Sequence, residues 1–194
     1  MGRPTLTERR RAQTRHEIAE TALALFGREG YDRVSAETIA DEAGVSLRTF
    51  YRYFTGKDAV LSPIVTDGLN ELAERVAARP ARESLATALR NGYQEITPRQ
   101  GEEGVRLLIG LFLDVPALRS QWLEDLRRIE EALIPVVQER APRPLSDQHA
   151  QLSAAAAVTG LRVALESAAR SVPPVSPADA LRDALAYLSD GAKL

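Results

Sequence analysis

Apolar residues recur at helical spacing along almost the whole chain, and this pattern limits the fold more than any other feature. One stripe of such residues shares a single helix face and consists of Ile18, Ala19, Ala22, Leu23 and Phe26. Strand signals are weak, because β-branched and aromatic runs are few and no Asn-Gly hairpin turn occurs. The pattern therefore predicts an all-α protein.

Glycine and proline mark the joints between the expected helices. We expect three short N-terminal helices, over 7–27, 35–43 and 46–53, followed by six longer ones. The longer helices are expected over 58–79, 85–96, 105–113, 116–140, 146–171 and 176–189. The expected domains are residues 1–56, with a basic N-terminal arm, and residues 57–194, a helical bundle.

Several functional classes lack the residues that they need. The chain has no cysteine and only two histidines, His16 and His149, so disulfides, thiolate zinc sites and cysteine nucleophiles are excluded. The sequence predicts no catalytic group, metal or cofactor. The longest apolar run, 107–113, is far shorter than the roughly 20 residues of a membrane-spanning helix. The expected protein is soluble, cytoplasmic and free of membrane partners.

Charge is distributed unevenly although the formal net charge is only −2. Residues 1–57 hold ten basic and eight acidic residues, a net charge of +2, whereas 58–194 hold 15 basic and 19 acidic, a net charge of −4. Within residues 1–16 the only acidic residue, Glu8, stands against five arginines: Arg3, Arg9, Arg10, Arg11 and Arg15. A basic segment on an acidic body indicates a polyanionic partner such as nucleic acid.

Residues 35–57 carry the most specific signal in the chain. Two helices that meet at a tight turn need a small residue at the contact, a turn glycine, and an apolar residue on the second helix. Ala40, Gly44 and Phe50 meet these needs in that order, with Ser35 and Ser46 as N-caps. This spacing is typical of a helix-turn-helix.

The outward side chains of the second helix favour DNA binding. Arg48 is placed to read a guanine edge, and Lys57 supplies a positive charge for a backbone phosphate. We expect DNA-binding residues at Ser35, Thr38, Ser46, Leu47, Arg48, Thr49, Tyr51, Arg52, Tyr53 and Lys57, together with the arm residues Arg9, Arg10 and Arg11. Tyr51 has an alternative place against the core, and the arm arginines have an alternative role in solubility.

Over roughly residues 8–61 the chain resembles the TetR family of bacterial transcription regulators. The matching positions are Ile39, Ala40, Ala43, Gly44, Val45, Ser46, Thr49, Tyr51, Phe54 and Lys57. Arg48 departs from a common glycine and Tyr53 from a common histidine, and the run LRTFYRYF resembles the mycofactocin-regulator branch. The resemblance implies phosphate contacts at Tyr51, Tyr53 and Lys57, base reading by Arg48 and Thr49, and a variable helical body that dimerises and binds a ligand.

The last two expected helices are rich in alanine and glycine, which allow helices to approach closely. We expect a two-fold four-helix interface made by Val158, Leu161, Leu165, Leu181, Leu185 and Leu188. The alternative is that these residues are buried within a single subunit. Two reading helices in a dimer reach successive major grooves, which predicts a palindromic operator.

The middle helices hold more apolar residues than a thin bundle needs, so a ligand cavity is expected there. The candidate lining residues are Tyr93, Arg106, Leu107, Leu111, Trp122, Leu126 and Ile129. Core packing explains the same residues equally well. The sequence therefore predicts a homodimeric repressor released by a small molecule, with two alternatives: the same scaffold without an effector, and an α-helical enzyme.

Overall fold

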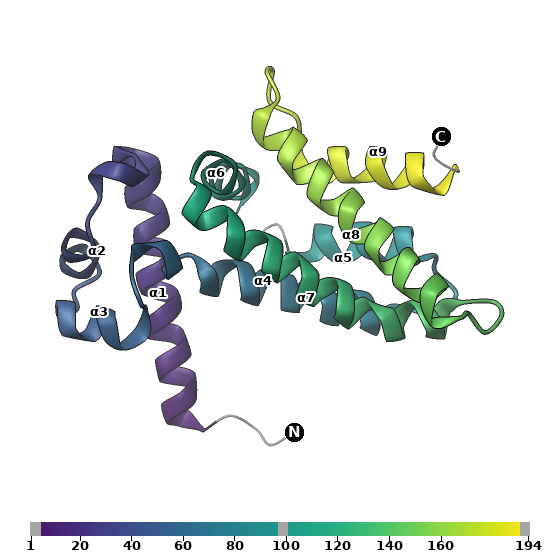
Figure 1. Cartoon of the computed structure of the whole chain (residues 1–194), viewed down its shortest axis with the longest axis horizontal. Helices are drawn as coiled ribbons and strands as arrows, with labels where there is room; N and C mark the ends of the chain where they lie inside the picture. Colours follow the sequence, from purple (N-terminus) through teal and green to yellow (C-terminus); the bar gives the residue numbers. More distant parts are fainter. Residues whose placement is uncertain (1–4, 97–100, 191–194) are drawn as a thin grey trace. The chain divides into compact units, whose positions relative to one another are not determined.

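The structure is a computed structural model that describes residues 5–96 and 101–190. These residues form nine α-helices and two 3-10 turns, with no strand among them, so the all-α prediction is confirmed (Figure 1). The chain divides into two compact units, Met1–Asp67 and Gly68–Leu194. The division lies within α4 (Ser62–Ala78), later in the chain than the boundary expected after residue 56.

The first unit begins with α1 (Leu6–Glu29), which is long rather than short. Thr5 and Glu8 form a capping box at its start, which satisfies N–H groups that the helix itself leaves unpaired. The buried stripe uses Leu25 in place of the expected Leu23, which is half-buried. After a 3-10 turn, η1 (Tyr31–Arg33), come α2 (Ala36–Glu42), α3 (Leu47–Tyr53) and a second turn, η2 (Lys57–Ala59).

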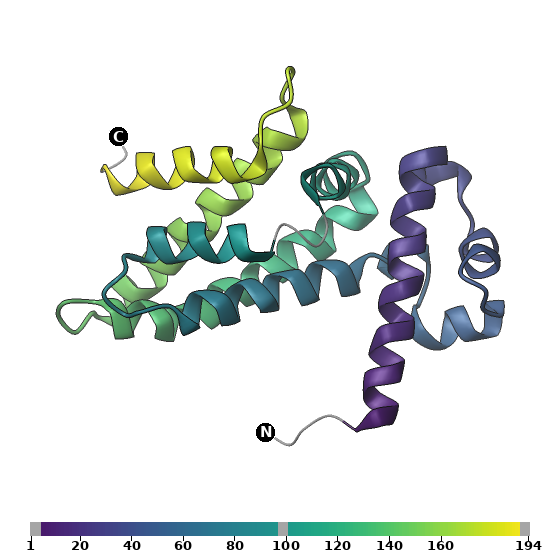
Figure 2. The same ribbon diagram turned by 180° about the vertical axis from the view of Figure 1, so that it is seen from behind.

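The second unit contains the helices that follow α4: α5 (Leu85–Ile96), α6 (Gly101–Asp114), α7 (Pro116–Arg140), α8 (Asp147–Arg170) and α9 (Pro177–Ser189). Helix α8 packs against α6, α7 and α9, and α5 lies beside α9 (Figure 2). Arg140, in the last turn of α7, donates from Nη2 to the carbonyls of Val76 and Arg79 at 2.5 and 2.9 Å. Because those carbonyls lie at the end of α4, the contact fixes that helix end to α7.

Helix α8 is long and apolar enough to cross a membrane by length and composition alone. Its mean hydropathy over the most apolar window is 1.2, and 44% of that window is buried against other helices. A core helix of a globular bundle passes the same test, because its apolar faces pack on several neighbours. The contacts with α6, α7 and α9 account for this composition.

Candidate nucleic-acid interface

The turn between α2 and α3 is fixed by its backbone. Gly44 adopts a φ of +67°, a left-handed conformation that favours glycine. The N–H of Val45 donates to the carbonyl of Ala40 at 2.9 Å, and the N–H of Gly44 donates to that of Asp41 at 3.1 Å. These two bonds form a Schellman motif, which ends α2 and sets the direction of the chain into α3. The positions identified from sequence spacing therefore form the helix-turn-helix turn itself.

Helix α3 is anchored by its apolar side and presents its polar side to solvent. Phe50 is fully buried, and its ring lies 5.3 Å from that of Phe54. On the opposite side Arg48 and Arg52 are exposed, and Tyr51 is 53% exposed. Tyr51 therefore does not pack inside the core, although its ring edge contacts Phe50. This side of α3 holds guanidinium and hydroxyl groups that can reach base edges and phosphates.

The serine and threonine candidates bond to their own helices. Ser35 accepts from the N–H of Thr38 at the start of α2, and Ser46 accepts from the N–H of Thr49 at the start of α3, both at 3.1 Å. The paired hydroxyls also lie within hydrogen-bond distance of each other, at 3.1 and 3.0 Å. The described geometry thus gives Ser35 and Ser46 a capping role, with Thr38 and Thr49 as their partners, and Leu47 beside Ser46 is half-buried.

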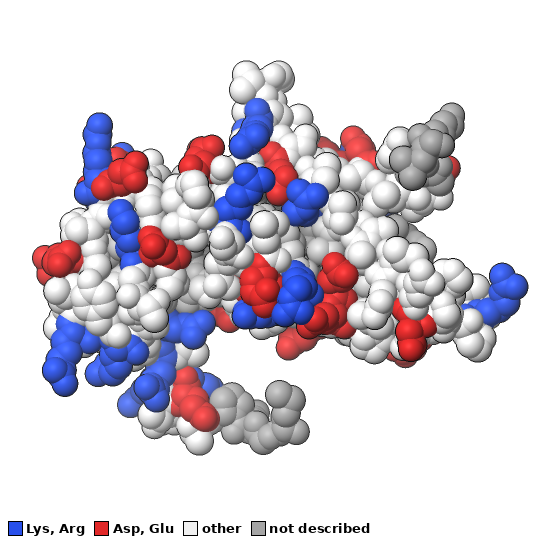
Figure 3. All heavy atoms as spheres, in the orientation of Figure 1, with Lys and Arg blue, Asp and Glu red and all other residues white. Residues whose placement is uncertain are grey.

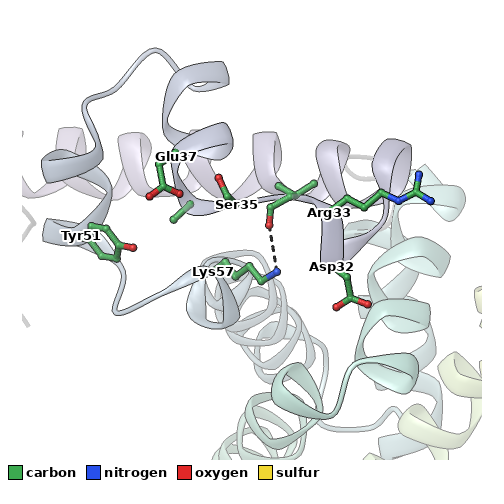
Figure 4. A pocket seen from close by; sticks show the side chains of 8 residues that line it. Asp32, Arg33, Ser35, Glu37, Tyr51 and Lys57 are labelled. Carbon is green, nitrogen blue, oxygen red and sulfur yellow. Dashed lines mark hydrogen bonds between the residues drawn. The ribbon is translucent and has the colours of Figure 1, made fainter.

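Lys57 lies in the short turn η2, and the helix expected over 58–79 begins later, at Ser62. Its Nζ donates to the backbone carbonyls of Tyr31 and Val34 at 3.1 and 3.2 Å, and lies 4.2 Å from the centre of the Tyr31 ring. In Figure 4 a dashed line ends at the Lys57 side chain and marks its bond to the Val34 carbonyl. An ammonium has three donors, and these two hydrogen bonds use two of them.

A cleft opens beside Lys57, and we call it the Lys57 cleft. Figure 4 shows Tyr51 at one side of it and Asp32 at the other. Its wall combines cationic and hydroxyl groups with two carboxylates, and the lining residues are Asp32, Arg33, Val34, Ser35, Ala36, Glu37, Tyr51 and Lys57. Of the sequence candidates it brings together Ser35, Tyr51 and Lys57.

Tyr31 lies beside Lys57 and is not among the candidate residues of the sequence analysis. It is half-buried, and its hydroxyl donates to Asp58 on η2. Partial burial and the hydrogen bond to Asp58 raise the pKa of Tyr31 above its ordinary value. Together with the Lys57 contacts, this bond ties η1 to η2. The aromatic residue and the lysine lie 26 positions apart, so no local sequence pattern connects them.

The arm arginines described by the structure lie on a helix. Arg9, Arg10 and Arg11 occupy the first turns of α1 and are exposed, whereas Arg3 lies outside the described residues. In Figure 3, lysine and arginine side chains gather below α3 and along the N-terminal half of α1. Tyr53 is half-buried, and the guanidinium carbon of Arg52 lies 5.1 Å from its ring centre.

The effector candidates of the second unit are mostly core residues. Tyr93, Trp122, Leu126 and Ile129 are at most 5% exposed, whereas Leu107 and Leu111 are half-buried. The Trp122 ring stacks on Phe112 at 5.6 Å between centres, and its Nε1 is buried with no hydrogen-bond partner among the described residues. Arg106, half-buried, donates to the carbonyl of Val175 at 3.4 Å.

The interface candidates need a correction. Val158, Leu161, Leu165, Leu181 and Leu185 are at most 6% exposed within a single chain, and Leu188 is half-buried. They lie between α8 and neighbouring helices of the same subunit, which is the alternative stated above. The outward faces of the same helices instead carry exposed Leu152, Val163 and Tyr187. Apolar periodicity identified buried faces but did not distinguish burial within a subunit from burial between subunits.

Across residues 5–96 and 101–190, no group of three or more His, Cys, Asp or Glu side chains is placed to hold a metal ion. Three acidic residues of α7, Glu124, Asp125 and Glu131, are instead paired with arginines of the same helix. Glu124 pairs with Arg127 at 2.9 Å, and Asp125, which is buried, pairs with Arg128 at 3.0 Å. The hydrogen bond from Arg127 lowers the pKa of Glu124.

Comparison with known proteins gives two family matches. Residues 18–63 match the bacterial regulatory proteins of the tetR family, and residues 79–193 match the MftR C-terminal domain. The chain is similar to the HTH-type transcriptional regulator TcmR of Streptomyces glaucescens, at 31% identity over 74% of this chain and 67% of that one. MftR of Mycobacterium tuberculosis is 42% identical over 27% of this chain and 26% of its own.

Among solved structures, the fold is similar to that of FadR from Thermus thermophilus, a transcriptional repressor crystallised with lauroyl-CoA. The TM-score is 0.62 and the identity is 23%, over 93% of this chain and 95% of that chain. At this identity the likeness concerns the fold, and it extends through both units.

Proposed function

The chain belongs to the TetR family of bacterial regulatory proteins, and from that premise we propose that it is a repressor which binds a palindromic operator as a homodimer and is released by a small molecule. The single observation that carries the DNA-binding part is the polar side of α3. Arg48, Tyr51 and Arg52 are exposed there, on a helix that is fixed by its turn and its buried phenylalanines. We propose this action in the cytoplasm, as a regulator rather than an enzyme.

In the proposed complex Arg48 contacts base edges, whereas Tyr51 and Lys57 contact backbone phosphates. Arginine pairs with the O6 and N7 atoms of guanine through two hydrogen bonds, and such a pair discriminates by about 1–3 kcal/mol. Phosphate contacts carry no sequence information. Lys57 also holds η1 through Tyr31 and Val34, so its replacement changes the fold locally as well as the charge.

The test selects bound duplexes from a random pool and then compares two variants on the selected operator and on scrambled DNA. Arg48→Ala is expected to bring the two affinities closer together. Tyr51→Phe removes only an exposed hydroxyl and is expected to weaken both affinities by a similar factor. If Arg48→Ala keeps the full preference, or if the wild type selects no sequence, the assignment of α3 as the reading helix is wrong.

We propose that dimerisation uses the outward faces of α8 and α9. Leu152, Ala156 and Val163 recur at helical spacing and are all exposed on α8, and Tyr187 is exposed on α9. Exposed apolar residues that share one face mark an interaction site more strongly than scattered ones. A two-fold pairing would repeat this face on both subunits and place two α3 helices on one operator.

The interface is tested by Val163→Glu, which is expected to give monomers in analytical ultracentrifugation because a charge cannot be buried without a partner. Leu123→Glu is the matched control, since Leu123 is equally exposed on α7 but lies outside the proposed face. A monomeric wild type, or dissociation by Leu123→Glu alone, would exclude this interface.

We propose an effector site between α6 and α7, around Trp122. Its buried N–H lacks a hydrogen-bond partner among the described residues, and a buried donor is costly unless something accepts from it. A ligand carbonyl beside an apolar chain would satisfy the N–H and the surrounding apolar residues together. The fold likeness to a repressor crystallised with lauroyl-CoA makes that compound the first probe.

Trp122 is the only tryptophan of the chain, so its fluorescence reports on this site alone. Lauroyl-CoA is expected to change the emission and to weaken operator binding, because a ligand shifts a conformational equilibrium by its differential affinity. Trp122→Phe keeps an aromatic ring for stacking and removes the N–H, and it is expected to weaken the response of operator binding. If a wider ligand screen changes neither emission nor operator binding, regulation without an effector is favoured.

A further inference from the structure

A second cleft, which we call the arginine cleft, flanks α3 on the side away from Tyr51. It joins the N-terminal half of α1 to the C-terminal end of α3, and its lining residues are Arg11, Ala12, Arg15, Arg52, Tyr53 and Asp67. Arg11 and Arg15 are one helical turn apart and share a face of α1. Tyr51 and Tyr53 are about 200° apart around α3, so the Lys57 cleft and the arginine cleft lie on opposite flanks of the helix.

The guanidinium groups of this cleft are not used by the fold. Among the described residues, Arg11, Arg15 and Arg52 make no hydrogen bond or ion pair with a protein group, and Arg52 only contacts the Tyr53 ring. Several arginines elsewhere in the described chain are paired, as Arg28 is with Glu29 and Arg162 with Glu166, and the arginine cleft differs in gathering three unpaired arginines around one hollow. The one carboxylate of the cleft, Asp67, lies 3.4 Å from Nδ1 of His16 instead.

Several unpaired guanidinium groups close to one another favour the binding of an anion. A helix in the major groove has a phosphate backbone on each side of it. The Lys57 cleft faces one of these walls in the proposed complex, and the arginine cleft would face the other. The three arginines come from two helices, so a single phosphate between them would fix α1 as well as α3 against the DNA.

We propose that the arginine cleft binds one backbone phosphate of the operator, shared by Arg11, Arg15 and Arg52, on the groove wall opposite the Lys57 cleft. The inference rests on the proposed function and adds a second point of attachment, with Arg15 as a contact that the sequence analysis did not include. Asp67 is a counter-charge that holds the affinity of this phosphate site below its maximum.

The experiment measures the affinity of the full-length protein for a 24-base-pair duplex of random sequence over a series of salt concentrations. A duplex of random sequence isolates the contribution of phosphate contacts to binding. Each lost phosphate contact reduces the magnitude of the slope of log K against log salt by about 0.9. The proposal requires all three guanidinium groups to hold the phosphate, so Arg11→Ala, Arg15→Ala and Arg52→Ala are each expected to reduce the slope per subunit by about one contact. Because they share one phosphate, the double variant Arg11→Ala/Arg15→Ala is expected to lose no more than either single variant.

Arg28→Ala is the matched control, since Arg28 lies on the same helix about 25 Å further along and already pairs with Glu29. It is expected to leave the slope unchanged. Asp67→Asn removes the counter-charge while keeping the shape, and it is expected to tighten binding about threefold. Circular dichroism confirms that each variant is folded, and Arg15→Lys, which keeps the charge, is expected to retain the slope.

Three results would overturn the proposal. Slope losses that add in the double variant would indicate diffuse attraction by the whole basic surface, and so would an equal loss in Arg28→Ala. Unchanged slopes in all three single variants would place the phosphates elsewhere. A wild type that shows no salt-dependent binding to duplex DNA would instead remove the proposed function on which the inference rests.

Discussion

In the first unit the candidate functional side chains are mostly polar and at least partly exposed, whereas in the second unit they are mostly apolar and buried. Arg48 and Tyr51 stand outside a small core that Phe50 completes. Trp122 and Leu126 lie within a larger core and share its composition. Burial in the core already accounts for an apolar residue, so burial alone does not mark Trp122 or Leu126 as a ligand contact.

The two units also differ in how much destabilisation by a substitution each can tolerate before it unfolds. The first unit spans only residues 1–67, and a core of that size supplies only about 3–5 kcal/mol of stability. The second unit is larger and contains the only tryptophan, Trp122. Tryptophan fluorescence therefore follows unfolding of the second unit alone, while operator binding requires the first. The two signals therefore allow the effect of a substitution to be measured in each unit separately.

The largest expected effect comes from a pair of phenylalanines. Phe50→Ala is expected to cost about 3–5 kcal/mol, which is comparable to the whole stability of the first unit, so DNA binding is lost while the Trp122 unfolding transition keeps its midpoint. Phe112→Ala is the matched variant in the second unit, where Phe112 is 1% exposed and stacks on Trp122. It is expected to lower the midpoint of the Trp122 transition in denaturant. A lowered Trp122 midpoint in Phe50→Ala would contradict the independence of the two units.

The next effect concerns the contact between α8 and α9. A Cβ added at Gly160 would lie 2.9 Å from Leu188 Cδ1 and 3.5 Å from Leu185 Cδ2. Gly160→Val is therefore expected to destabilise the second unit by about 1–3 kcal/mol through overpacking, measured by Trp122 fluorescence in urea. Gly110→Ala, which meets nothing within 4 Å, is expected to be neutral or slightly stabilising because alanine favours helix. Equal effects of the two variants would mean that α9 does not approach α8 this closely.

A smaller effect is expected at the turn that directs α3. Gly44→Ala meets no atom within 4 Å, so its cost comes only from the left-handed backbone and is about 1–2 kcal/mol. Gly56→Ala is the control, because its surroundings are equally open but its φ of 175° is extended backbone. The first unit is expected to unfold at a lower urea concentration in Gly44→Ala only. Loss of DNA binding is the signal that reports this unfolding. Similar midpoints for both variants would exclude strain at the turn.

The sequence predicted the parts of the first unit that depend on local chemistry. Gly44 and the caps at Ser35 and Ser46 follow from what one turn or one helix start requires, whatever the rest of the chain does. The sequence did not predict that Lys57 bonds to the Tyr31 and Val34 carbonyls. Those contacts join segments distant in the chain, and backbone carbonyls leave no signature in side-chain types.

In the second unit the sequence predicted the helices and their buried faces. It did not predict whether each face packs within its own subunit or against a second subunit. Leu161 and Leu181 were expected between subunits and lie inside one subunit, because the apolar period is the same in both cases. Leu23 and Leu25 show a similar ambiguity in α1, where both lie near the edge of one apolar stripe. Pattern alone fixes the angle of a stripe only approximately, and tertiary packing decides which leucine is covered.

The smallest expected effect is at Tyr31, whose hydroxyl donates to Asp58. Tyr31→Phe removes this bond and is expected to cost about 1 kcal/mol at pH 7. Since folding raises the pKa of Tyr31, the folded state retains this proton more strongly than the unfolded state. The hydroxyl's contribution is therefore complete below the ordinary tyrosine pKa of about 10 and declines as the pH rises above that value. The difference between wild type and Tyr31→Phe, measured by urea unfolding of the first unit, is expected to shrink at alkaline pH.

Tyr187→Phe, at an exposed position of α9, is expected to match the wild type throughout. A difference that stays constant up to high pH would show that the Tyr31 hydroxyl does not hold η1 to η2.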